Sequence, residues 1–455
     1  MAAEDPTSPV TLVDPPPEQA PGAGALASAL RRASGDGTVI MMAGTIVAGL
    51  TAYAWQAVGT RTLGEVTFAP VANAWTIMFL VVTILLAPVE QYATRTVAEG
   101  WTGRAHLRRS FRTLARMGAA ATVLVSAVAF LLRDSLFDGV WGYALICGAI
   151  VLGFGQLALC RGILAGERKF AGYGWITGLD GVVRVVVALP LLLGFDDALV
   201  FAATIPVSTV VALFWIREWP TREEGRSAGP YGIPVGQFIA TTVGGTSAAQ
   251  VIVAGGPLIL ALIGGSKAAV SSLFITQTAF RGAFLVATPG WARVLPVLTG
   301  IHLRDEHWRL TRIAELILAG SAAVAAAAGF GAAIVGPPLI GLLFGEGVRP
   351  SALVAGLMAA GTVLAIGNLG LNQVLIARVQ THRITAAWWV ALTMMLLWLV
   401  AGPGSAADRV APGFVIGEAV ALILLTVASS SRLAPPSVRR AVYRARDRRE
   451  RRRVP

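Results

Sequence analysis

Apolar stretches of about 20 residues, nearly free of charge, follow one another from residue 37 to residue 430. A helix of that length crosses the hydrocarbon core of a bilayer, whereas the strands of a membrane barrel alternate apolar and polar residues. Soluble chains are about 25% charged. This chain is 14% charged and 55% hydrophobic, so it cannot cover a globular surface with polar groups. The sequence therefore predicts an all-α, polytopic membrane protein whose solvent is lipid.

The apolar stretches predict about twelve transmembrane helices. They lie at residues 37–60, 68–96, 113–132, 140–165, 172–194, 198–216, 236–263, 268–297, 311–335, 351–377, 384–401 and 411–430. The preceding segment is rich in Pro, Ala and acids, which is typical of a disordered tail. It lacks the charged and apolar regions of a signal peptide.

The positive charges alternate between successive loops. With the N-terminus inside, 30 of the 37 Lys and Arg residues fall in inside segments and five fall in outside loops. Cytoplasmic loops carry such an excess, and a wrong helix count would invert the bias partway along the chain. The pattern predicts an even number of helices with both termini in the cytoplasm. The Arg-rich, Lys-poor composition indicates a GC-rich bacterial genome, hence a bacterial cytoplasmic membrane.

The two halves of the chain contain similar segments. Residues 102–108 (TGRAHLR) follow the second predicted helix and residues 299–304 (TGIHLR) follow the eighth. Parallel six-helix repeats with substrate held between them are a transporter architecture. The predicted divisions are an N-terminal tail (1–34), an N-lobe (35–216), a cytoplasmic linker (217–235), a C-lobe (236–430) and a basic C-terminal tail (431–455).

Several kinds of chemistry are not expected from this composition. The two cysteines, Cys147 and Cys160, lie in one apolar run, the four histidines are scattered, and no metal-ligand spacing or phosphate loop occurs. We expect no cofactor, no metal and no enzyme activity. A net charge of +12 would indicate nucleic acid in a soluble protein. Here the cations flank predicted spans, and the basic run from residue 437 predicts contact with anionic lipid instead.

Three motifs carry a resemblance to a known family. Residues 61–65 (RTLGE) end the first helix, residues 161–166 (RGILAG) precede Phe170 and Tyr173, and residues 343–346 (LFGE) precede the tenth helix. In this order they resemble Wzx-type flippases, in the polysaccharide branch of the multidrug/oligosaccharidyl-lipid/polysaccharide exporter superfamily. The resemblance covers nearly all of residues 37–430. It implies two six-helix lobes around a central cavity and the movement of lipid-linked sugars across the membrane.

Two arginines, Arg184 and Arg281, lie near the middle of predicted spans, one in each lobe. A charge in hydrocarbon costs at least about 2.5–3.5 kcal/mol, so each should face a cavity or a partner. Guanidinium binds phosphate oxygens bidentately, and we expect both arginines to bind a pyrophosphate. Asp180 lies four residues before Arg184, which leaves open a buried pair that serves only packing. Arg281 has only Gln277 at the matching position.

Other polar and helix-breaking residues are candidates for the cavity or its gates. The neutral cavity candidates are Gln56, Gln277, Asn368 and Asn372, with hydrogen bonding between helices as the alternative. The gating and coupling candidates are Arg61, Glu65, Glu90, Arg95, Glu418, Pro257 and Pro289. Interface anchoring is the alternative for the charged pairs. Glu418 is also a candidate proton or cation site, and both prolines predict helix kinks.

The sequence thus predicts a transporter that flips a polyprenyl-pyrophosphate-linked oligosaccharide to the outer leaflet by alternating access, for cell-surface polysaccharide biosynthesis. Expected partners are membrane lipids and a polysaccharide polymerase or glycosyltransferases. One alternative is an ion-coupled multidrug antiporter of the same superfamily, which needs carboxylates in its cavity. Another is a non-transporting scaffold for polysaccharide assembly. A membrane glycosyltransferase would need a large extramembrane loop, and the longest inter-helix stretch, 217–235, is short.

Overall fold

The computed structural model describes residues 37–100, 104–190, 197–218, 235–304 and 306–430, and all regular structure in these ranges is helical. The N-terminal helices are α2 (Thr38–Leu80), a π-helix (Val81–Leu86), α3 (Ala87–Ala98), α4 (Arg104–Leu131), α5 (Arg133–Leu136), α6 (Gly142–Gly166), α7 (Phe170–Ala188), α8 (Ala198–Val207) and a 3-10 helix (Ser208–Glu218). The C-terminal helices are α9 (Val235–Ala254), α10 (Gly256–Leu262), α11 (Lys267–Leu303), α12 (His307–Phe344), a 3-10 helix (Glu346–Val348), α13 (Ala352–Ala377), α14 (Thr381–Ala401) and α15 (Ala406–Ser430). Every predicted helix falls on one of these segments.

The helical membrane fold is confirmed. Among the described residues, eight helices are long and apolar enough to cross a membrane, or nine if the bent pair α9 and α10 forms one span. This count is lower than twelve for three reasons. Residues 38–98 count as one span of 61 residues, residues 198–214 count as a shorter apolar helix, and α7, which carries Asp180 and Arg184, is not among the candidate spans.

Gly64 folds α2 back on itself. Its φ of 74° and ψ of 167° are non-helical. Trp55 and Trp75 on either side of it are stacked with ring centroids 4.6 Å apart. A continuous helix would separate them by about 30 Å. The predicted spans 37–60 and 68–96 are therefore the two arms of one hairpin, and the long span crosses the membrane twice.

A second break separates α9 from α10, which are bent by 75°. The break lies at Gly255, and Pro257 stands in the first turn of α10. Proline has no backbone N–H, so the Val253 carbonyl four residues earlier loses its helical donor. The Gln277 side chain of α11 donates to that carbonyl instead, at 2.8 Å. The break predicted from the Gly-Gly-Pro sequence is present, and Gln277 compensates it.

Pro289 lies within α11, which runs from Lys267 to Leu303. The helix is therefore not interrupted at this proline. A gating role for Pro257 or Pro289 stays a prediction.

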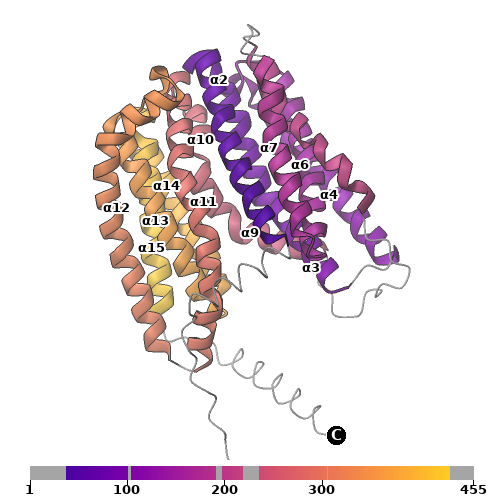
Figure 1. Ribbon diagram of the computed structural model, residues 1–455. Helices are drawn as coiled ribbons and strands as arrows, with labels where there is room; N and C mark the ends of the chain where they lie inside the picture. The colour runs from indigo at the N-terminus through magenta and orange to yellow at the C-terminus, as the bar shows by residue number, and fades with distance from the viewer. Residues whose placement is uncertain (1–36, 101–103, 191–196, 219–234, 305, 431–455) are drawn as a thin grey trace, which may run out of the picture.

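Two large hydrophobic cores hold the helices together. One is built mainly from residues 55–212 and the other from residues 248–425. Figure 1 shows α12 to α15 on one side and α3, α4, α6 and α7 on the other, with α2, α10 and α11 between them. The lobe boundaries stay a prediction. The tail 1–34 and the tail 431–455 lie outside the described residues, as does nearly all of the linker 217–235.

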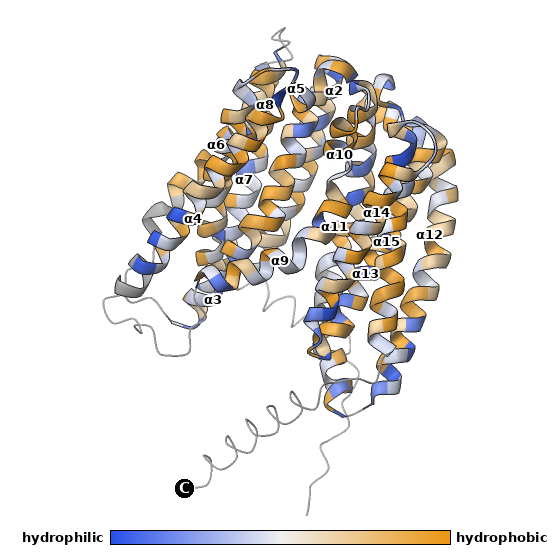
Figure 2. Ribbon diagram, turned by 180° about the vertical axis from the view of Figure 1, so that it is seen from behind, coloured by the Kyte–Doolittle hydropathy of each residue, from blue (hydrophilic) through white to orange (hydrophobic). Residues whose placement is uncertain are grey.

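Two helices present most of their apolar surface outward. Only 6% of the most apolar stretch of α4, and of α12, is buried. Val123, Leu131, Phe330 and Leu342 are all exposed by more than half. Figure 2 shows that the apolar colour extends along the outward helix surfaces. A patch of this size would aggregate in water, so lipid must cover it.

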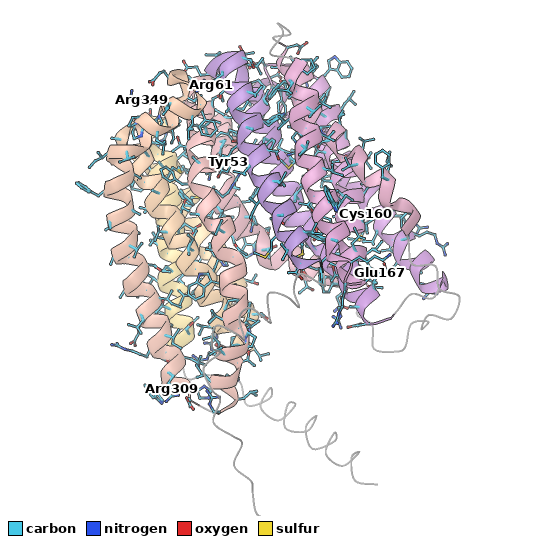
Figure 3. The ribbon with its side chains drawn as sticks, viewed as in Figure 1. Tyr53, Arg61, Cys160, Glu167, Arg309 and Arg349 are labelled. Atoms are coloured by element: carbon cyan, nitrogen blue, oxygen red, sulfur yellow. The ribbon has the colours of Figure 1, made fainter. Side chains whose placement is uncertain are left out.

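Polar contacts join the two halves at one end of the molecule, and elsewhere Tyr92 of α3 contacts Phe238 of α9, with ring centroids 5.8 Å apart. Arg61 donates to the carbonyls of Leu342 and Leu343, and Thr60 donates to the carbonyl of Phe344 at 2.7 Å. These are the last carbonyls of α12, which have no helical donor and carry the negative end of its dipole. In Figure 3, Arg61 and Arg349 lie at this end and Arg309 lies at the opposite one. The segments predicted to be outside and inside therefore lie at opposite ends.

The reversal at Gly64 supplies a test of the fold. A Cβ at Gly64 meets no atom within 4 Å, but its φ lies in the region that L-residues rarely adopt. Gly64→Ala should therefore destabilise the protein by roughly 1–2 kcal/mol through backbone strain alone. Gly49 of α2 is the matched control, because its Cβ also meets no atom and its φ is not positive. Thermal unfolding in detergent should show a lower midpoint for Gly64→Ala only, and equal midpoints would contradict the hairpin.

Candidate functional site

The Arg281 guanidinium is buried between the two halves. The residue is 7% exposed. Its guanidinium carbon lies 3.9 Å from the centre of the Phe79 ring of α2. Its one hydrogen bond to a side chain is a 3.5 Å contact with the Thr278 hydroxyl. Within the described ranges, no carboxylate forms an ion pair with it. Arg281 is thus a buried cation whose charge is not balanced by an acid.

A small cavity opens beside Arg281. It is lined by Val253, Gln277, Arg281, Phe284, Thr362, Ala365 and Phe414, from α9, α11, α13 and α15. Its volume of about 10 Å³ is close to the least that holds one water molecule. In this conformation the cavity therefore has no room for a ligand group, and a cargo headgroup would need the surrounding helices to move apart. Arg281 is the charged member of the lining.

Arg184 lies in a different environment. Its guanidinium bonds to Asp180 at 2.6 Å and to the Ser208 hydroxyl at 3.3 Å, and Ser208 donates to the other Asp180 oxygen at 2.6 Å. The rings of Trp75 and Phe154 cover it at 5.1 and 5.6 Å. Arg184 does not line the cavity beside Arg281. These contacts favour the packing alternative for the Asp180–Arg184 pair.

Asn368 and Glu418 form a buried polar pair between α13 and α15. Both are 0% exposed. The Asn368 amide donates to the Glu418 carboxylate at 2.8 Å and to its backbone carbonyl at 3.0 Å. Glu418 Oε1, Asn368 Oδ1 and Asn372 Oδ1 are buried without a hydrogen-bond partner. Unsatisfied oxygens of this kind fit a proton or a cation, because such ligands supply the missing positive charge.

Gln56 is buried in the first arm of α2. It is 0% exposed, and neither its amide nitrogen nor its amide oxygen has a hydrogen-bond partner. The structure does not place it in the cavity lining. Its role in binding a sugar hydroxyl stays a prediction.

The gating candidates separate into the two ends of the molecule. At the end of Arg61, the Glu65 backbone carbonyl accepts a hydrogen bond from Ser271 of α11 at 2.6 Å. At the other end, Glu90 pairs with Arg161 at 3.0 Å and accepts from the Tyr173 hydroxyl at 2.9 Å. Arg95 pairs with Glu99. Glu90 and Arg95 therefore form separate pairs, each within the N-terminal helices.

Several residues of the site escape sequence reasoning. Phe79, Tyr53 and Phe414 are ordinary apolar or aromatic members of predicted spans, and only their tertiary neighbours set them apart. Tyr53 of α2 donates to the Thr278 carbonyl of α11 at 3.0 Å, one turn before Arg281. Arg161 and Tyr173 lie inside the motif that carries the family resemblance, which was the available signal for a role at that position.

Comparison with known proteins yields distant, uncharacterised relatives. No protein-family model matches the chain. Uncharacterized protein Rv1510 of Mycobacterium tuberculosis is 26% identical over 340 residues, which cover 72% of this chain and 76% of that protein. Uncharacterized protein Mb3654 of Mycobacterium bovis is 27% identical over 322 residues, which cover 68% and 72%.

Solved structures reveal the fold more clearly. An inward-facing multidrug resistance MATE family transporter of the MOP superfamily aligns with a TM-score of 0.62 at 14% identity, over 86% of this chain and 97% of that one. Such a transporter in an outward-facing conformation gives 0.55 at 14% identity, over 86% and 94%. A MOP superfamily transporter from Pyrococcus furiosus, described by the reverse polarity of its binding pocket, gives 0.57 at 16% identity, over 87% and 94%. The chain therefore has the fold of the MATE transporters.

The Asp180–Arg184–Ser208 group allows packing to be separated from binding. Removing one partner of a buried ion pair costs about 3–5 kcal/mol, whereas replacing both with apolar residues is often neutral. Asp180→Leu alone should lower the midpoint of thermal unfolding. The double variant, Asp180→Leu with Arg184→Met, should recover both the wild-type midpoint and transport activity in cells. A stable but inactive double variant would instead show that Arg184 contacts the cargo.

Proposed function

We propose that this protein is a membrane transporter that flips a polyprenyl-pyrophosphate-linked oligosaccharide from the cytoplasmic to the outer leaflet. The observation that carries the proposal is the buried Arg281 guanidinium, which lines a cavity and pairs with no carboxylate in the described residues. Its cargo supplies the missing negative charge. No bond is made or broken in the cargo, so the activity is transport rather than catalysis.

Pyrophosphate suits this site chemically. A guanidinium presents a planar fork of N–H donors that binds two phosphate oxygens at once. Away from water, the attraction between such charges is much stronger than at a surface. Thr362 adds a hydroxyl to the lining, and Phe284 and Phe414 add apolar surface. The polyprenyl chain stays in lipid while the headgroup enters between the two halves.

Alternating access is supported by where the halves touch. Their contacts include Arg61 and Thr60 with the end of α12, Ser271 with the Glu65 carbonyl at 2.6 Å, and Lys267 with Asp138 at 2.8 Å. The positive-inside pattern assigns this end to the outside. The higher TM-score against the inward-facing MATE transporter, 0.62 against 0.55, agrees with an inward-facing state. Breaking these contacts would let the halves rock outward.

A multidrug antiporter is the second candidate, because two of the structural neighbours are described as multidrug resistance transporters. An organic cation needs a carboxylate in the cavity. The lining residues here include a cation and no acid. The neighbour from Pyrococcus furiosus is described by a binding pocket of reverse polarity. That description agrees with different proteins of this fold carrying cargo of opposite charge. Because the lining here contains a cation, we favour an anionic cargo.

The coupling ion is proposed to bind at Glu418. This carboxyl lies one turn beyond Phe414 on α15, and Phe414 lines the Arg281 cavity. A proton or a monovalent cation on Glu418 would remove a buried charge from the same helix that borders the cargo. We propose that both termini lie in the bacterial cytoplasm. There the basic tail meets anionic lipid, and polymerases or glycosyltransferases are the expected partners.

Lipid analysis of a depletion strain tests the proposal. The accumulated polyprenyl-pyrophosphate oligosaccharide, measured by mass spectrometry, should be cleared by the wild-type gene. Arg281→Gln should clear it roughly 10–100-fold more slowly, because a charged hydrogen-bonding partner is worth about 1.5–3 kcal/mol. Arg312 is the control, since it is exposed and pairs with Glu315 at 3.2 Å. Arg312→Gln should clear the lipid at the wild-type rate.

Two results would contradict the flippase. One is a depletion strain that accumulates no lipid-linked sugar and becomes sensitive to cationic dyes, which would support the antiporter. The other is an Arg281→Gln protein that reaches the membrane in normal amount and clears the lipid as fast as wild type.

A further inference from the structure

Phe79 covers one face of Arg281. The two side chains come from different halves of the molecule, Phe79 from the second arm of α2 and Arg281 from α11. The guanidinium carbon lies 3.9 Å from the ring centre, which is the closest of the arginine–aromatic contacts described here. Phe79 is not part of the cavity lining. Arg281 therefore contacts both the Phe79 ring and the cavity, while the ring itself does not line the cavity.

The stack determines how a ligand can approach. A guanidinium has two flat faces, which stack on rings, and an edge of N–H groups in its plane, which donates hydrogen bonds. With one face against Phe79, the in-plane edge is the part that an anion can bind. An edge-on ligand must offer two oxygens at the spacing of the fork, as phosphate groups do. The ring thus favours a phosphate-type oxyanion over a small spherical anion.

The backbone around Phe79 is unusual. The π-helix Val81–Leu86 begins two residues later, and the Thr83 hydroxyl donates to the Phe79 carbonyl at 2.8 Å. π-helical turns are rare and occur frequently at functional sites, because the wider turn shifts the direction of the neighbouring side chains. On the side of α11, Tyr53 donates to the Thr278 carbonyl, and Gly282 has no side chain to displace the Tyr53 hydroxyl. Both sides of the stack are therefore held in place.

We propose that Phe79 is a positioning residue that orients Arg281 for edge-on binding of a phosphate-type oxyanion and makes its affinity depend on which way the transporter faces. The inference rests on the proposed function. Because Phe79 and Arg281 belong to different halves, the stack exists only while those halves stay together at this depth. A transporter needs a cargo affinity that differs between its two states. Separation of the ring from the cation lowers the affinity and releases the cargo outside.

Binding of inorganic pyrophosphate to the purified full-length protein in detergent tests this role. Phe79→Leu keeps an apolar side chain but removes the ring, and we expect its affinity to fall roughly 30-fold, since a desolvated cation–π contact is worth about 2 kcal/mol. Phe79→Trp keeps a stacking ring and should bind within threefold of wild type. The control is Phe330→Leu, because Phe330 is 73% exposed on the lipid-facing helix α12. It should bind as wild type does.

The outcomes separate this inference from the proposed function. Arg281→Gln should lose pyrophosphate binding, and if it binds like wild type the proposed cargo site itself is wrong. If Arg281→Gln loses binding while Phe79→Leu binds like wild type, the cargo site stands and the role of Phe79 is refuted. If Phe79→Trp is as weak as Phe79→Leu, the side chain matters only for packing and the stacking role is refuted as well.

Discussion

The cost of keeping a guanidinium in hydrocarbon governs this structure. A charge at the centre of a helix in lipid costs at least about 2.5–3.5 kcal/mol, and interactions with partner groups must offset this cost. For Arg184 the protein itself offsets this cost, through Asp180, Ser208 and two aromatic rings. Arg281 has a ring on one side and a cavity beside it. We propose that this difference between two similar arginines gives the fold a place for an anionic cargo.

The same reasoning connects the cargo site to the rest of the molecule. The break at Gly255 leaves the Val253 carbonyl without a helical donor, and Gln277 fills that place one turn before Arg281. At the far end, Arg61 and Thr60 fill the equivalent role for the last carbonyls of α12. Each interruption of a helix in lipid must be satisfied by a neighbouring helix. Polar contacts between helices therefore occur where the helices break, beside the cavity and at the end of α12.

The sequence predicted what depends on local pattern. Hydropathy located every long helix and the turn between the spans 37–60 and 68–96, and the Gly-Gly-Pro run located the bend, because these follow from the residues themselves. It did not predict that Trp55 stacks on Trp75 across that turn, that Glu90 pairs with Arg161 rather than acting with Arg95, or that Phe79 covers Arg281. These contacts join residues far apart in sequence. Asp180 lies one helical turn from Arg184, so that pair was recognisable, whereas Ser208 of another helix was not.

Flipping by the purified protein in liposomes tests the central claim most directly. A fluorescent polyprenyl-pyrophosphate saccharide and its neutral analogue, which has the same sugar and lipid without the pyrophosphate, would be followed by quenching from outside. We predict rapid flipping of the charged lipid by wild type, slow flipping by Arg281→Gln, and little flipping of the neutral analogue by either protein. Equal flipping of both lipids, with no effect of Arg281→Gln, would contradict a cargo site built on a buried cation.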